Sequence, residues 1–123
     1  MRHVLIGNSF PVSLIQRRVV CLMIDRNDFL SQINGCKICS FWGHANTLKV
    51  AGEFAGVDLA PRVTRPVMKL SECGLPMLDG IEFNTCWILS PLYARNFRPA
   101  IGEEVDEKMI TDWRIVKMEW RVK

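Results

Sequence analysis

What the 123-residue chain lacks excludes several classes of protein. Its longest apolar stretches, such as 19–24 and 86–89, fall far short of the roughly 20 residues that cross a bilayer, so we expect no membrane span. The N-terminus has one basic residue before a short apolar run and no small-residue cleavage site, so we expect no secretory signal and a cytoplasmic location. Without repeats, low-complexity segments or a linker, residues 1–123 are expected to form a single domain.

The cysteines are few and odd in number, which argues against a disulfide framework and favours reduced thiols. Only Cys36 and Cys39 have metal-ligand spacing, and a zinc site would need two more ligands. Cys73 or His44 could be recruited, but the sequence holds no second matching pair. We therefore expect no metal and no cofactor.

Charge is also limited, with 16 basic against 13 acidic residues and a net charge of +3. This mild excess gives no reason to expect binding to long nucleic acid. Two segments, 61–69 and 95–98, contain basic residues and no acidic residue. They could line one anion site together, or they could be solvated loop charge.

The residue patterns predict an α+β (mixed α/β) fold, with a mixed sheet of about five strands flanked by two or three helices. Residues 18–24 are rich in β-branched side chains and almost continuously apolar, which predicts a central strand buried on both faces. The other expected elements are a strand at 2–7, a short helix at 12–15, a helix capped by Asp25 or Asn27 that runs to Ile33 and is closed by Gly35, a hairpin of strands 66–70 and 80–89 joined by a turn at 71–79, and a last strand at 113–122.

One histidine lies at a position suited to phosphate chemistry. Leu48, Ala51, Phe54 and Ala55 have helical spacing and Gly56 follows in the C′ position, so His44 lies just before a helix. Asn46 or Thr47 is the expected N-cap. The free N–H groups of the first helical turn favour a phosphate in front of them.

At this point the sequence resembles a known family, the viral ring nucleases, which are type III anti-CRISPR proteins of archaeal viruses and phages. The resemblance spans most of the chain and follows the family's order. It is carried by Asn8-Ser9-Phe10 with Leu14, Ile24-Asp25-Arg26 with Phe29, Gly43-His44 with Thr47, Gly56, Thr64-Arg65 with Met68-Lys69-Leu70, and Arg98 with Gly102.

The resemblance implies a homodimer whose interface cradles one molecule of cyclic tetra-adenylate. It also implies metal-independent cleavage of that ring to linear oligoadenylate with a 2′,3′-cyclic phosphate. Destroying this second messenger would counter type III CRISPR immunity.

The resemblance also assigns roles to residues. His44 would be the general acid, since imidazole titrates near neutrality and can protonate the leaving 5′-oxygen. Arg98 would assist catalysis, because a guanidinium stabilises charge that develops on phosphoryl oxygens. Substrate contacts would come from the first turn, from the histidine motif and from the middle of the chain, namely Asn8, Ser9, Ser13, Gly43, Thr47 and Arg65.

Several of these assignments have alternatives. Alignment from Gly56 favours Arg62 over Arg65, and extra residues after Arg95 would favour Arg95 over Arg98. Asn8, Ser9 and Ser13 could instead cap the following helix.

The chain also departs from the family at two positions. The family commonly has a glutamate before the late glycine, where this chain has Ile101, and Pro11 replaces a family serine. Glu103 or Glu104 could compensate for the missing carboxylate, or it is dispensable.

The tryptophans could stack on adenines. The three on expected strands, Trp87, Trp113 and Trp120, fit buried positions instead, and only Trp42 is expected near the site.

Two other functions are compatible with the sequence. One is a protein that binds cyclic oligoadenylate without cutting it, which the missing glutamate suggests. The other is a small dimeric adaptor or nucleic-acid-binding module, whose binding to long RNA or DNA would be sensitive to salt.

Overall fold

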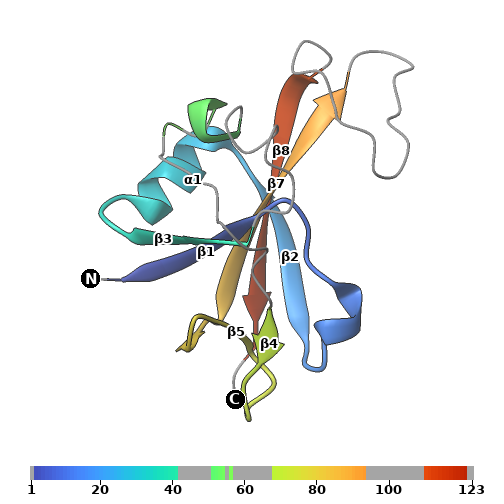
Figure 1. The fold of residues 1–123 in the computed structure, drawn as a ribbon. Helices are drawn as coiled ribbons and strands as arrows, with labels where there is room; N and C mark the ends of the chain where they lie inside the picture. The colour runs from blue at the N-terminus through green and yellow to red at the C-terminus, as the bar shows by residue number, and fades with distance from the viewer. Residues whose placement is uncertain (1, 42–50, 55, 57–67, 94–109, 122–123) are drawn as a thin grey trace.

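A mixed five-stranded sheet forms the centre of the molecule (Figure 1). The structure is a computed structural model and describes residues 2–41, 51–54, 56, 68–93 and 110–121. The strands of this sheet lie in the order β2-β8-β7-β1-β3. Their bounds are β1 (His3–Gly7), β2 (Val19–Ile24), β3 (Lys37–Ser40), β7 (Thr85–Tyr93) and β8 (Ile110–Trp120). The predicted α+β class and mixed sheet are confirmed.

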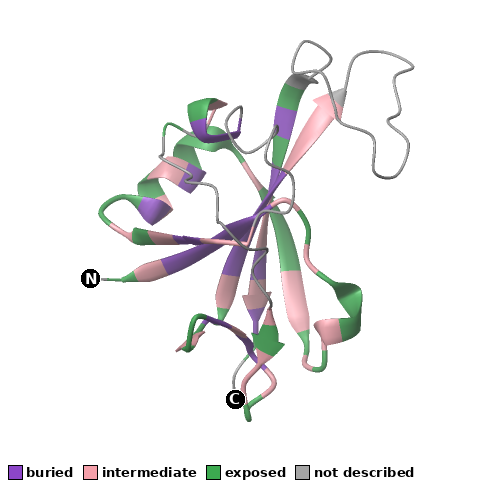
Figure 2. Ribbon diagram, in the orientation of Figure 1, coloured by how far each residue is buried: buried purple, intermediate pink, exposed green. Residues whose placement is uncertain are grey.

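Strand β1 is one of the three inner strands of this sheet, and both covering layers pack on it. It runs parallel to β3 on one side and to β7 on the other. Val4, Leu5 and Ile6 are at most 1% exposed, because alternate side chains are covered on opposite faces (Figure 2). Burying each of these side chains fully stabilises the fold by about 1.5–3 kcal/mol.

Helix α1 (Arg26–Ile33) covers one face of the sheet through Phe29 and Ile33, which pack with Val4 and Ile6. Asp25 is its N-cap, and the carboxylate accepts a hydrogen bond of 2.8 Å from the Asp28 N–H. Gly35, one residue beyond the C-cap, has a φ of +74°. These features confirm the helix predicted from 25 to 33.

The opposite face is covered by a small sheet that the sequence analysis missed. It consists of β4 (Lys69–Leu70), β5 (Pro76–Leu78) and β6 (Ile81–Glu82), joined in that order as antiparallel neighbours. Asp79 and Gly80 both have positive φ, 53° and 79°, which is the geometry of a two-residue hairpin turn. This turn pairs β6 with β5, so the predicted hairpin of 66–70 with 80–89 is wrong.

Strand β2 lies at an edge of the sheet, so its predicted central position is also wrong. It pairs only with β8 in the described residues, and Cys21, Leu22 and Met23 are exposed. The inner position belongs to β8, which buries Trp113 and Ile115 on one face and Met118 and Trp120 on the other. Those side chains offer more apolar surface than β2 does, and this decides which strand is inside.

Large aromatic side chains occupy the interior as expected. Trp87, Trp113 and Trp120 are all at least 92% buried, which confirms their predicted core positions. The Lys117 ammonium lies 5.7 Å from the centre of the Trp87 ring, at the distance of a cation–π contact. The short helix predicted near 12–15 is a single 3₁₀ turn, η1 (Val12–Leu14).

Within the described residues, no helix combines the length and apolarity that a membrane crossing needs.

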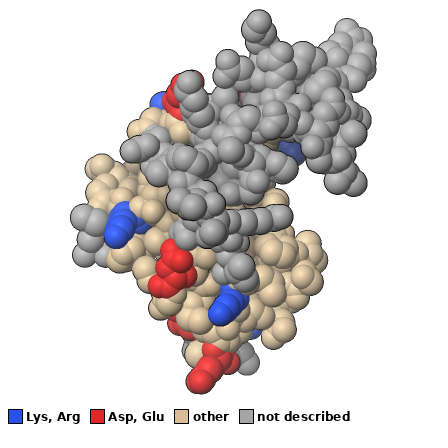
Figure 3. All heavy atoms as spheres, viewed as in Figure 1, with Lys and Arg blue, Asp and Glu red and all other residues tan. Residues whose placement is uncertain are grey.

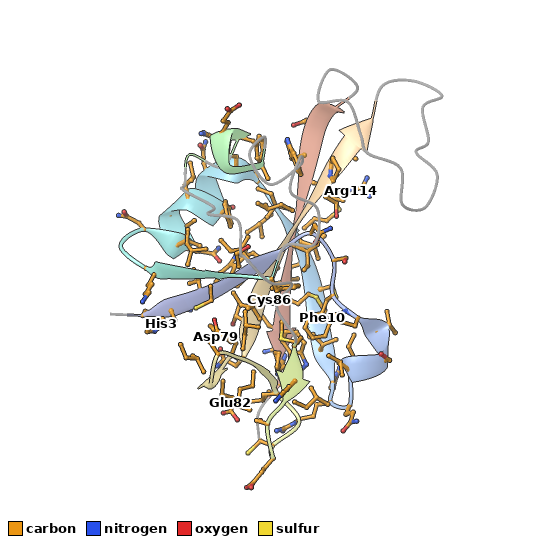
Figure 4. The ribbon with its side chains drawn as sticks, viewed as in Figure 1. His3, Phe10, Asp79, Glu82, Cys86 and Arg114 are labelled. Atoms are coloured by element: carbon orange, nitrogen blue, oxygen red, sulfur yellow. The ribbon has the colours of Figure 1, made fainter. Side chains whose placement is uncertain are left out.

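All five cysteines are free thiols, as predicted. Cys36 packs with the cluster under α1, whereas Cys39 is buried in the cluster on the opposite face. The two sulfur atoms therefore lie on different faces of the sheet and do not point toward a common ion. Cys86 lies at the centre of the molecule, where burial raises the pKa of its thiol well above the usual range (Figure 4).

Because only the thiolate reacts, we expect Cys21 and Cys73 to be alkylated quickly at pH 8 and Cys86 only through unfolding. Peptide mass spectrometry of timed samples measures the labelling of each cysteine. Labelling of Cys86 as fast as Cys21 would contradict the buried position of Cys86.

Burial of the Cys86 thiol also makes stability depend on pH. The thiol ionises at lower pH in the unfolded protein than in the folded one, so its contribution to stability is complete below about pH 8.5 and is lost as pH rises through the folded-state pKa. A Cys86→Ala variant should lack this alkaline loss of stability.

Candidate functional site

Three strands of the five-stranded sheet have their C-terminal ends close together. We call this end of the sheet the carboxyl edge; it is formed by the ends of strands and is distinct from the outer strands β2 and β3. The strands β1, β2 and β3 point the same way and end at Gly7, Ile24 and Ser40. In the sheet register, Gly7 lies beside Ile88 of β7. The last residue of β2, Ile24, lies only one row of residues further along the sheet. In open sheets with parallel strands, ligands bind outside the carboxyl ends of the strands.

A close fit between Gly7 and Phe41 fixes the start of two connections that leave this edge. The Phe41 N–H donates a 3.0 Å hydrogen bond to the Ile6 carbonyl, which continues the pairing of β3 with β1. A Cβ atom on Gly7 would collide with the Phe41 ring. Phe41 in turn meets Phe10 edge to face, with ring centres 6.3 Å apart. Glycine at position 7 therefore lets the aromatic ring lie across the end of β1.

A helical segment at 51–54 returns the chain to the sheet close to the start of α1. Ala51 is fully buried in the cluster under α1, and the Phe54 ring is stacked on Trp113 with ring centres 6.0 Å apart. The Arg26 Nε–H donates a 2.7 Å hydrogen bond to the Phe54 carbonyl. Gly56 has a φ of +69°, which agrees with its predicted place just after the helix.

These contacts fix the described residues on either side of positions 42–50, among which is the predicted histidine. Phe41 is fixed where β3 ends, and Ala51 and Phe54 are fixed on the face covered by α1. His44, Gly43 and Thr47 themselves lie outside the described residues.

The predicted arginines also lie outside the described residues, at 57–67 and 94–109. Arg62 and Arg65 belong to the first segment, and Arg95 and Arg98 to the second, together with Ile101. The second segment connects β7 to β8. Strand β7 extends beyond the residue that pairs with Gly7, from residue 89 to Tyr93. At about 3.3 Å per residue, this extension is about 17 Å long.

The first turn contributes two of its three predicted residues to the carboxyl edge. Asn8 and Ser9 directly follow Gly7, whereas Ser13 is on η1, which Figure 1 shows beside the lower part of β2. The N-cap of η1 is Pro11, without a side-chain hydrogen bond to the turn. Pro11, and not Asn8 or Ser9, is therefore the N-cap residue of η1.

Sequence reasoning missed the residues that position the site. Gly7 and Phe41 shape the start of two connections, and Arg26 ties α1 to the 51–54 helix. A glycine at the end of a buried strand is a signal for close approach by another group. The sequence presents Arg26 only as part of the Ile24-Asp25-Arg26 motif, because its partner is a backbone carbonyl that no sequence pattern identifies.

A comparison of the chain with protein-family models found no match, and a comparison with curated protein sequences found none.

We expect Gly7→Ala to destabilise the protein by about 1–3 kcal/mol, because the added methyl group overpacks the contact with Phe41. Urea denaturation measures the loss. The matched background is Phe41→Leu, in which Gly7→Ala should cost clearly less. An equal cost in both backgrounds would show that the collision with the ring is not the cause.

Proposed function

We propose that this protein is a metal-independent ring nuclease that binds cyclic tetra-adenylate and cleaves it to linear oligoadenylate with a 2′,3′-cyclic phosphate. In this proposal it works as a homodimer in the cytoplasm, that of the host cell if a virus encodes it, and counters type III CRISPR immunity. The observation that carries the proposal is the carboxyl edge. The connection that begins with Asn8 and Ser9 and the one that carries His44 both leave from it, anchored by the contact of Gly7 with Phe41.

The proposed chemistry needs little from the protein beyond positioning and proton transfer. The 2′-hydroxyl loses its proton to solvent water as it attacks the neighbouring phosphorus, the P–O5′ bond breaks, and His44 protonates the departing 5′-oxygen. Arg65 and Arg98 would hold the phosphates and stabilise the added charge. The anchors on both sides of segment 42–50 support this role, because a general acid acts only when it is held within hydrogen-bond reach.

A homodimer fits the symmetry of the ligand. A ring of four equivalent nucleotides has two-fold symmetry, so two identical sites, each with one His44, can meet it in the same way.

A non-cleaving protein that sequesters the ring is the second candidate, and Ile101 favours it, because the family's glutamate is missing there. Labelled cyclic tetra-adenylate incubated with the protein in EDTA distinguishes the two. We expect ring opening to linear product, since the proposed proton transfer needs no metal. Tight binding with an intact ring would instead establish the sequestering protein, and restoration of cleavage by a divalent metal would refute metal independence.

The variant His44→Ala tests the assigned residue. Loss of a general acid should lower the single-turnover cleavage rate by roughly 10²-fold or more and leave the dissociation constant of the ring nearly unchanged. Rapid-quench kinetics and equilibrium binding measure the two quantities, with the melting temperature as the folding control. A structural histidine would lower the melting temperature, binding and cleavage together, and near-normal cleavage would remove His44 from the mechanism.

A further inference from the structure

Three arginines meet at the end of the sheet opposite the carboxyl edge, and we call them the arginine cluster: Arg17, Arg18 and Arg121. Arg17 and Arg18 precede β2, and Arg121 follows β8. The Arg121 N–H donates a 3.0 Å hydrogen bond to the Arg18 carbonyl, so these two residues lie directly opposite each other. Residues in such a pair project to the same face, and like charges there are unfavourable.

Arg17 is hydrogen-bonded beside this pair. Its Nη1 and Nη2 groups donate hydrogen bonds to the carbonyls of Cys73, at 2.9 Å, and Arg121, at 3.2 Å. Its side-chain carbons run close to Gly74, where an added Cβ atom would lie 3.1 Å from Arg17 Cγ. Both hydrogen-bond acceptors are neutral carbonyls, so neither of them offsets the positive charge of the Arg17 guanidinium.

The positive charge of the cluster is not cancelled by a neighbour that the structure describes. No carboxylate among residues 2–41, 51–54, 68–93 and 110–121 forms an ion pair with any of the three arginines. Glu119, opposite Val20 in the register, instead has its carboxylate 3.8 Å from Lys117 Nζ. On the face that Figure 3 shows, the described basic and acidic side chains are interspersed. The cluster is therefore a region of uncancelled positive charge, which attracts anions.

The space beside the cluster has the size of a ligand site. The arginine cluster and Val20 line a hollow of about 540 Å³. Small-molecule sites usually measure about 300–1,000 Å³, so the hollow has room for more than a phosphate ion. Guanidinium groups match phosphate oxygens in a bidentate way, which an ammonium group does not.

We infer that the arginine cluster binds a phosphomonoester, with the phosphate on Arg18 and Arg121 and the organic group in the hollow beside Val20. Arg17 adds charge and holds the β4–β5 turn against β8. The site is at the start of β2, whereas the proposed ring site is at its end, so the inference does not depend on the proposed function.

The first test is a titration with ribose 5-phosphate, inorganic phosphate and ribose, followed by calorimetry and by amide NMR shifts. Ribose 5-phosphate should bind and shift the amides of Arg18, Gly74 and Arg121, inorganic phosphate should bind more weakly, and ribose should not bind. Equal affinity for inorganic phosphate would overturn the assignment of an ester. Absence of binding by both phosphates would overturn the site itself.

The second test uses variants of exposed residues that make no side-chain contact in the core. Arg18→Gln and Arg121→Gln should each weaken binding of ribose 5-phosphate by about tenfold or more, because each loses a charge-assisted hydrogen bond. Arg18→Lys should fall between wild type and Arg18→Gln. The matched control is Arg114→Gln, an exposed arginine near the other end of β8 (Figure 4), which should bind normally. Unchanged affinity in Arg18→Gln and Arg121→Gln would refute the site.

Competition separates this site from the proposed ring site. Saturating cyclic tetra-adenylate should leave the affinity for ribose 5-phosphate unchanged, and Arg18→Gln should leave ring cleavage unchanged. Displacement of ribose 5-phosphate by the ring would overturn the inference, whether or not the ring is cleaved.

Discussion

Burial of β1 on both faces is the constraint on which the rest of the structure depends. Val4 and Ile6 pack under α1, and Leu5 packs on the opposite face against the layer that contains β5. Because both neighbours of β1 run parallel to it, the chain must cross over the sheet between them, and the ends of these strands collect at one edge. The carboxyl edge is therefore a consequence of the hydrophobic core.

The contact of Gly7 with Phe41 and the hydrogen bond from Arg26 to Phe54 show how this core positions a site. One fixes where the chain leaves the sheet before residue 42, and the other fixes where it returns after residue 50. Neither of these two contacts has to include a ligand in order to affect the site. Such residues control geometry, so their loss changes stability and positioning together.

Much of the architecture was predictable from local patterns, and the failures have physical causes. Helix α1 was predicted to within its caps because Asp25 and Gly35 act locally, and Gly56 ended the next helix for the same reason. The central position assigned to β2 failed because strand order is decided by competition between distant segments, here between β2 and β8. The small sheet was missed although Asp79-Gly80 is a strong hairpin signal, because β5 and β6 are very short. For His44, Arg65 and Arg98 the roles stay predictions, since they lie outside the described residues.

The edge position of β2 has a practical consequence for handling the protein. Its six residues, Val19–Ile24, include no charged residue or proline, which are common protections of an edge strand against other chains. Hydrogen bonding to β8 uses the backbone groups of alternate residues, and those of Val19, Cys21 and Met23 face outward. No other described strand pairs with this side of β2, and apolar edges of this kind promote aggregation at high concentration. A single charged substitution at Met23, which is 73% exposed, would therefore protect this edge without disturbing the core.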